Sequence, residues 1–265
     1  MSASAAGGVD SRQRVHQCRR FRRVQSFTTG IFPVAQFDIG QNPFVAPGYI
    51  TIRLGHHDFA GGMMADDPMY HDGMRRLQDV RETRPLADRL EQVTVRRAFT
   101  DDDREFIQRC PMFFIATADA HGHPDCSYKG GLPGFVRVLD DRTLAIPDFD
   151  GNGMYRTWGN VLVNPNVGLM FLDFEHPKRL RVNGTAQVSE DDPLRDEYPG
   201  SVFIIRVTAN RIFPNCPRYI HRMQLAEHSV YVPRSEHTPP VPAWKTFDAF
   251  RDSLPARDRD GGKCE

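Results

Sequence analysis

The sequence has few lysines, no long hydrophobic run and no paired cysteines, and each shortage argues against a class of protein. No stretch approaches the ~18 uncharged apolar residues of a membrane span, so we expect no membrane insertion. The five cysteines are odd in number and show no CxxC spacing, which argues against a disulfide framework or a structural zinc site. This cysteine usage favours a reducing, cytoplasmic setting. Only four of the 34 basic residues are lysines, so the position of each is of interest: Lys129, Lys178, Lys245 and Lys263.

The chain also lacks net charge. Its 34 basic and 34 acidic residues balance, which argues against attraction of the whole protein to nucleic acid or an anionic membrane. A small local anion site remains compatible with that balance. With 265 residues and 40% hydrophobic composition, the chain suits one large or two small domains with a buried core.

Residues 1–63 differ from the rest of the chain. Residues 1–37 carry six arginines against a single acid, Asp10, and show no helical or strand period. Such a leader fits an organellar transit peptide, a disordered basic arm or a translated upstream stretch whose true start is Met63 or Met64. We favour the third interpretation, because regular helix chemistry begins just after Met64.

Helical patterns follow this leader. Apolar residues recur between residues 68 and 93, and Pro85 is expected to divide that stretch into two helices. Thr100, followed by three aspartates, is typical of a helix N-cap, and Pro111 should end the helix that it begins. Residues 64–110 are therefore predicted to form a set of N-terminal helices.

Short apolar runs bounded by turns dominate residues 111–232 and predict strands. One helix, expected over residues 153–164, interrupts them. We predict a mainly β (α+β) fold, a six-stranded Greek-key split barrel with flanking helices, rather than a parallel α/β sheet. Residues 233–265 form a proline-rich tail that should wrap the surface or be partly disordered. Seven runs are candidates for these six strands: 112–118, 124–129, 135–139, 143–147, 167–172, 180–189 and 202–213.

An ordered series of motifs runs through this region. An Asp-x-x-Gly-x-Pro turn (119–124) precedes Ser127-Tyr-Lys129, and Ile146-Pro-Asp-Phe-Asp-Gly-Asn152 precedes the helix. The series resembles the FMN-binding split barrel of the pyridoxamine 5′-phosphate oxidase-like family, and residues 213–220 resemble a subgroup of predicted flavin-nucleotide-binding proteins. The likeness implies an FMN cofactor bound at the interface of a homodimer.

The resemblance also implies the site residues. Glycines before a helix allow close backbone approach, and a helix N-terminus with an arginine one turn in suits a phosphate dianion. Alternation along a strand would put Ser127 and Lys129 on one face. The implied cofactor-binding residues are Ser127, Tyr128, Lys129, Asp150, Gly151, Asn152, Arg156, Thr157 and Arg179.

Two features depart from pyridoxamine 5′-phosphate oxidase itself. Thr157 stands where that enzyme has a second phosphate-binding cation, and its C-terminal arginine-and-histidine motif has no counterpart. We therefore expect a flavin-dependent oxidoreductase acting on another small molecule, and the sequence identifies no catalytic acid or base. Alternatives are a non-enzymatic flavin carrier or a haem-binding split barrel, which would need a ligand such as His121, His123 or His221. Segment 215–219 either covers the flavin or simply ends a strand.

Overall fold

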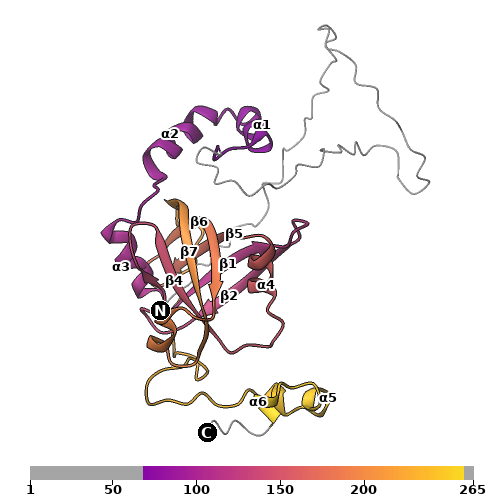
Figure 1. Ribbon diagram of the computed structural model, residues 1–265. Helices are drawn as coiled ribbons and strands as arrows, with labels where there is room; N and C mark the ends of the chain where they lie inside the picture. Colours follow the sequence, from indigo (N-terminus) through magenta and orange to yellow (C-terminus); the bar gives the residue numbers. More distant parts are fainter. Residues whose placement is uncertain (1–67, 260–265) are drawn as a thin grey trace, which may run out of the picture. The chain divides into compact units, whose positions relative to one another are not determined.

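A computed structural model describes residues 68–259 of the chain (Figure 1). The predicted leader, residues 1–63, lies outside the described residues. Within residues 68–259, no helix is both long enough and apolar enough to cross a membrane.

Three helices precede the sheet, as the sequence predicts. α1 (Asp72–Val80) and α2 (Arg84–Thr94) are separate because Pro85 lies in the first turn of α2, where its missing N–H costs nothing. α3 (Asp101–Arg109) begins with a complete capping box, in which Thr100 and Asp103 each accept a hydrogen bond from the backbone N–H of the other. These observations confirm the predicted division near Pro85 and the predicted N-cap at Thr100.

Seven antiparallel strands form one sheet in the order β2-β1-β5-β6-β7-β4-β3. The β1–β2 hairpin and β4 with β3 occupy opposite edges, while β5, β6 and β7 form the middle of the sheet. The mainly β fold with flanking helices is confirmed. The strands are β1 (Met112–Ala118), β2 (Pro124–Gly130), β3 (Arg137–Val138), β4 (Thr143–Phe149), β5 (Asn166–Asp173), β6 (Lys178–Ser189) and β7 (Ser201–Pro214).

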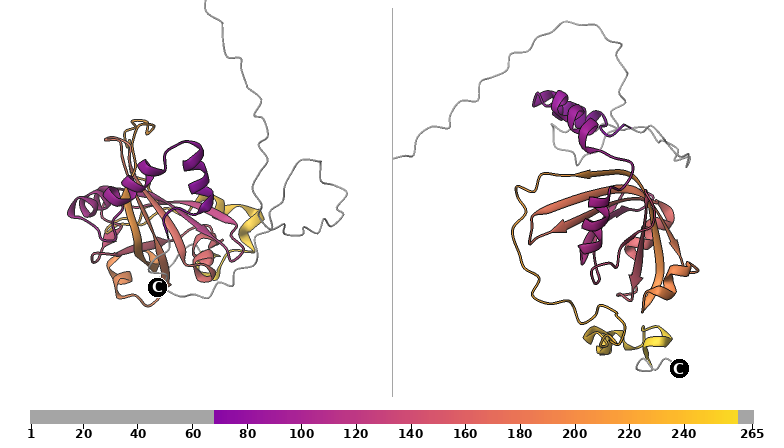
Figure 2. Two further views of the ribbon diagram at one scale, coloured as in Figure 1. Left: turned by 90° about the horizontal axis from the view of Figure 1, so that it is seen from above. Right: turned by 90° about the vertical axis from the view of Figure 1, so that its left-hand side faces the viewer.

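Six of these strands are long, and β3 adds a two-residue seventh at the edge. The sheet curves strongly, as two views at right angles show (Figure 2). A register shift in β6 between Asn183 and Gly184 contributes to this curvature. A side chain at Gly184 would collide with the carbonyl oxygen of Thr208 on β7, so only glycine allows the strands to approach so closely there.

The core lies inside the curved sheet. Alternating residues of β1 point inward, and Phe113 and Ile115 are fully buried. α3 contributes Phe106 and Ile107 to the same core. By contrast, α1 and α2 bury no residue and expose a series of apolar side chains: Met74, Leu77, Val80, Leu86, Leu90 and Val93.

The helix inserted between β4 and β5 is shorter than predicted. α4 spans Arg156–Val163 rather than residues 153–164. Gly153 (φ +72°) and Tyr155 (φ +48°) both adopt left-handed backbone conformations, which interrupt a helix. Arg156 is consequently the first residue of α4 and does not lie one turn in.

The rest of the chain adds short elements around the sheet. The tail predicted from residue 233 is proline-rich but contains three helical turns within the described residues. The three helical turns of the tail are η2 (Ala243–Thr246), α5 (Asp248–Arg251) and α6 (Ala256–Arg259). A further short element, η1 (Pro193–Glu197), lies between β6 and β7.

Candidate functional site

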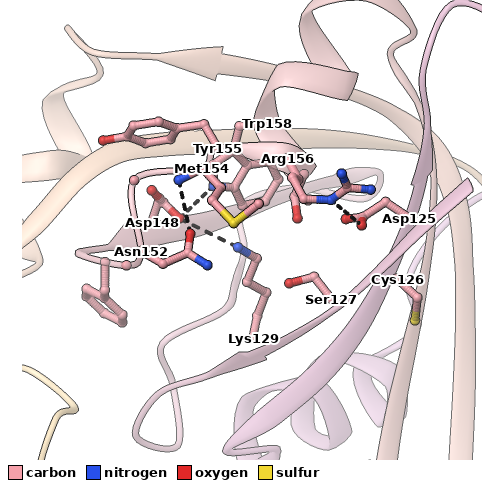
Figure 3. A pocket seen from close by; sticks show the side chains of 14 residues that line it. Asp125, Cys126, Ser127, Lys129, Asp148, Asn152, Met154, Tyr155, Arg156 and Trp158 are labelled. Atoms are coloured by element: carbon pink, nitrogen blue, oxygen red, sulfur yellow. Dashed lines mark hydrogen bonds and ion pairs between the residues drawn. The ribbon is translucent and has the colours of Figure 1, made fainter. Parts of the chain in front are cut away.

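A pocket lies between edge strand β2, the end of β4 and the start of α4. Its cavity volume is about 230 Å³. This volume lies below the roughly 300–1,000 Å³ that is usual for ligand pockets. The pocket is lined by Asp125, Cys126, Ser127, Lys129, Asp148, Phe149, Gly151, Asn152, Gly153, Met154, Tyr155, Arg156, Thr157 and Trp158 (Figure 3).

Strand β2 supplies one wall of the pocket. Asp125, Ser127 and Lys129 occupy alternate positions along the strand, so their side chains share one face (Figure 3). Tyr128 lies on the other face, where its ring meets Phe114 edge-on at 5.9 Å between centroids. Tyr128 does not line the pocket, although the sequence motif includes it and Cys126, two positions earlier, does line it.

At the inner end of the pocket, Lys129, Asp148 and Trp158 form a cluster (Figure 3). The indole Nε1 of Trp158 donates a hydrogen bond of 2.6 Å to Asp148 Oδ1, and Lys129 Nζ lies 3.7 Å from the same oxygen. Lys129 Nζ also lies 4.5 Å from the centroid of the Trp158 ring, within the range of a cation–π contact.

Burial shifts the pKa values of both charged members of this cluster. Desolvation raises the pKa of Asp148, and the Trp158 hydrogen bond and Lys129 only partly oppose it. Desolvation likewise lowers the pKa of Lys129, with Asp148 opposing. Opposed shifts of this kind, in which burial acts against a charged partner, are common in functional sites.

At the outer end, Arg156 and Asp125 form a second ion pair. Arg156 Nε donates to Asp125 Oδ1 at 3.1 Å, which places the guanidinium at the mouth of the pocket (Figure 3). The side chain of Arg156 is 61% exposed. The Asp125 side chain is only 17% exposed, so the pair is open to solvent on its arginine side, from which a competing anion could contact the guanidinium.

The N-terminus of α4 opens beside this ion pair. Tyr155 occupies the N-cap position, and no side chain caps the helix there. Uncapped N–H groups in the first turn, together with the helix dipole, suit a bound anion. Helix α4 is held against the sheet by Asn160 Nδ2, which donates to Thr117 Oγ1 of β1 at 3.1 Å.

The loop before α4 has a defined conformation. The Asn152 side chain accepts a hydrogen bond from the Met154 N–H at 3.0 Å, which forms an Asx turn. Asp150 does not line the pocket, because Lys245 of the tail pairs with its Oδ2 at 2.7 Å.

Six of the nine predicted cofactor-binding residues line the pocket: Ser127, Lys129, Gly151, Asn152, Arg156 and Thr157. Tyr128, Asp150 and Arg179 do not. Arg179 lies at the start of β6, opposite Leu172 in β5, and its buried Nε has no hydrogen-bond partner in the described structure. The cofactor contacts themselves stay predictions.

Sequence reasoning missed the two carboxylates of the pocket, Asp125 and Asp148. Asp125 could have been found, since it extends the alternation of Ser127 and Lys129 by one step. The pairing of Asp148 with Trp158 joins a strand to a helix and leaves no local signal. With these acids, two cations face two carboxylates, so the pocket has no excess positive charge of its own.

Part of the chain resembles a known protein family. Residues 99–216 match the family model described as pyridoxamine 5′-phosphate oxidase, which confirms the family resemblance over the sheet and α3. The search of curated proteins gives no match.

Solved structures that resemble part of this chain share little sequence with it. An FMN-binding protein from Syntrophomonas wolfei is 13% identical and matches 53% of this chain and 97% of its own, with a TM-score of 0.34. HupZ from Group A Streptococcus is 22% identical and matches 44% of this chain and 93% of its own, with a TM-score of 0.36. HutZ, the heme storage protein from Vibrio cholerae, is 22% identical and matches 43% of this chain and 89% of its own, with a TM-score of 0.30.

Proposed function

Because residues 99–216 match the pyridoxamine 5′-phosphate oxidase family, we propose that this chain binds FMN and acts as a flavin-dependent oxidoreductase on a small molecule. The observation that carries the proposal is the pocket beside the start of α4. There an exposed arginine, an uncapped helix N-terminus and two glycines meet at one mouth.

The outer end of the pocket would hold the phosphate. Arg156 uses Nε for Asp125, which leaves the Nη edge of its guanidinium to form a bidentate contact with phosphate oxygens. The backbone at Gly151 and Gly153 carries no side chain that would keep a phosphate away.

The inner end would face the flavin ring. Lys129 and the Trp158-bound Asp148 would orient the ring and tune its electronics, since both present polar atoms in a largely desolvated setting. A bound flavin supplies hydride transfer, and the protein residues bind and orient it. The geometry assigns no general acid or base for a substrate.

A homodimer is part of this proposal. The pocket of one chain measures about 230 Å³, below the roughly 300–1,000 Å³ that is usual for ligand pockets, and a second copy would enlarge the enclosure. Arg179, which lies outside the pocket of its own chain, could reach a flavin from such a second copy. Light scattering with and without FMN tests this, and a flavin-loaded monomer would refute it.

We propose that the substrate differs from pyridoxamine 5′-phosphate. The C-terminal arginine-and-histidine motif that would bind a substrate phosphate has no counterpart in this sequence, and Thr157, buried at the second position of α4, adds no cation. Conversion of pyridoxamine 5′-phosphate at or above about 10⁴ M⁻¹s⁻¹, an ordinary enzyme efficiency, would contradict this proposal.

An absorbance spectrum of the purified chain tests the cofactor. Two flavin bands would support the proposal, whereas a Soret band would support haem. None of the residues that line the pocket is a histidine, and His123 instead pairs with Asp119 in the β1–β2 turn at 2.8 Å. Reduction of bound flavin by NAD(P)H would then distinguish an enzyme from a carrier.

We propose a cytoplasmic location without a nucleic-acid partner on composition alone.

A further inference from the structure

The C-terminal tail carries a buried lysine that reaches the pocket loop. Lys245 lies in η2, and its side chain is only 6% exposed. Its Nζ pairs with Asp150 Oδ2 at 2.7 Å and with Asp258 Oδ1 at 3.0 Å. The ammonium thus joins the loop before α4 to the last described helical turn of the chain.

A second tail cation reaches the same loop. Arg257 Nη2 lies 3.7 Å from Asp150 Oδ1, so both carboxylate oxygens of Asp150 face cations of the tail. Tyr155 also lies close enough to Arg257 to help raise the pKa of its guanidinium. The tail therefore contacts both ends of loop 150–155. We call residues 243–258 the C-terminal clamp.

The loop that the clamp holds is part of the pocket wall. Phe149 and Gly151, on either side of Asp150, line the pocket, and Tyr155 is the N-cap of α4. Loss of the contact at Asp150 would free the segment that presents Gly151 and Gly153 to a bound anion. The effect of the clamp on the pocket is therefore geometric.

The clamp also acts on the charge of the site. Asp125 and Asp148 already balance Arg156 and Lys129, so an unpaired Asp150 would make the region net negative. Burial alone lowers the pKa of Lys245, but hydrogen bonds with Asp150 and Asp258 raise it overall, so the ammonium stays charged. Lys245 is buried but the Asp150 side chain is 46% exposed, so added salt should weaken the pair in part.

From these contacts we propose that the C-terminal clamp belongs to the phosphate-binding site, with Lys245 as a positioning residue that sets loop 150–155 through Asp150. Docking of the clamp and binding of FMN are then thermodynamically coupled. By reciprocity, FMN must favour the docked clamp by the same factor by which the docked clamp favours FMN. This inference rests on the proposed FMN site and assigns that site a second, distant part of the chain.

Titration of the full chain with FMN and with riboflavin tests the coupling. Lys245→Met keeps the aliphatic length and removes the charge, and should weaken FMN binding within the range of about 5- to 150-fold typical of coupled sites. The affinity for riboflavin, which lacks the phosphate, should fall by less than about twofold in the same variant. Lys245→Arg should recover part of the loss. In the Asp150→Asn background, Lys245→Met should have little further effect, because the interaction is already broken.

A matched control lies outside the clamp. Arg84 pairs with Asp79 in an exposed contact between α1 and α2, so Arg84→Ala should leave both affinities unchanged. Hydrogen exchange of residues 243–258 reports clamp docking independently of any activity. FMN should slow that exchange in the wild-type chain and have a smaller effect in Asp150→Asn.

The outcomes separate the two proposals. If the wild-type chain binds neither flavin, the FMN site and the coupling both fail. If it binds FMN, yet Lys245→Met speeds exchange of residues 243–258 without changing FMN affinity, the FMN site stands and the coupling is overturned. Folded Lys245→Met with slow exchange and unchanged affinity overturns it equally.

Discussion

The two ends of the pocket contain the same kinds of charge in different surroundings. At the inner end, the side chains of Lys129 and Asp148 are 23% and 10% exposed, and Trp158 adds a hydrogen bond. At the outer end, Arg156 is 61% exposed and holds Asp125 through a single nitrogen. Burial of a pair makes loss of one partner costly, whereas an exposed pair dissociates easily.

This difference indicates separate roles. The inner cluster is a fixed part of the fold, so it can orient a ring but cannot rearrange around a phosphate. The outer pair can exchange Asp125 for another anion, because its arginine is already solvated. The account therefore predicts that inner substitutions change stability and that outer substitutions change ligand preference.

The largest effect is expected from Asp148→Ala. The substitution leaves the buried Trp158 N–H without an acceptor and Lys129 without a partner, which should reduce the free energy of unfolding by about 2–4 kcal/mol. Asp148→Asn retains an acceptor and should cost clearly less. Urea denaturation of both variants and of Arg156→Ala, expected below about 1 kcal/mol, checks the comparison. Equal losses of unfolding free energy in Asp148→Ala and Arg156→Ala would contradict the difference between the two ends.

A smaller effect is expected from Lys129→Ala. Because Lys129 pairs with Asp148 at the inner end, its loss should weaken FMN and riboflavin together, by roughly tenfold or about 1.4 kcal/mol each. Fluorescence titration of the two ligands measures this. A loss confined to FMN would put Lys129 at the phosphate.

The pH dependence of stability should reveal the raised pKa of Asp148. Its ordinary value is 3.8 and burial raises it in the fold, so the folded state holds this proton more tightly than the unfolded state. That contribution is complete below the ordinary value and is lost as pH rises through the raised value. Asp148→Asn should remove this loss. Unfolding free energies of both proteins, measured from about pH 3.5 upward, should diverge accordingly; parallel curves would contradict the burial argument.

The smallest effect is expected from Asp125→Asn. Removal of the competing carboxylate should strengthen FMN binding a few-fold, less than about 1 kcal/mol, because the pair is exposed on its arginine side. Riboflavin affinity should not change. Weaker FMN binding in this variant would mean that Asp125 positions Arg156 and does not compete for it.

Much of the fold could be predicted from local patterns. Pro85 separated two helices and Thr100 capped a third because these residues act on their own backbone neighbours. The start of α4 could not be predicted, since the left-handed conformation of Tyr155 reflects its tertiary setting and not its residue type. The Asp148–Trp158 hydrogen bond and the Lys245–Asp150 pair join residues that only the folded chain brings together.

The central claim, that the outer end of the pocket binds the FMN phosphate, is tested most directly by one titration. FMN and riboflavin are titrated into the wild-type chain and Arg156→Ala, with Arg156→Lys as the conservative variant. A lost charge-assisted contact of about 1.5–3 kcal/mol predicts roughly ten- to hundredfold weaker FMN binding with riboflavin nearly unchanged, and partial recovery in Arg156→Lys. Equal losses for both ligands, or no loss, would contradict the account.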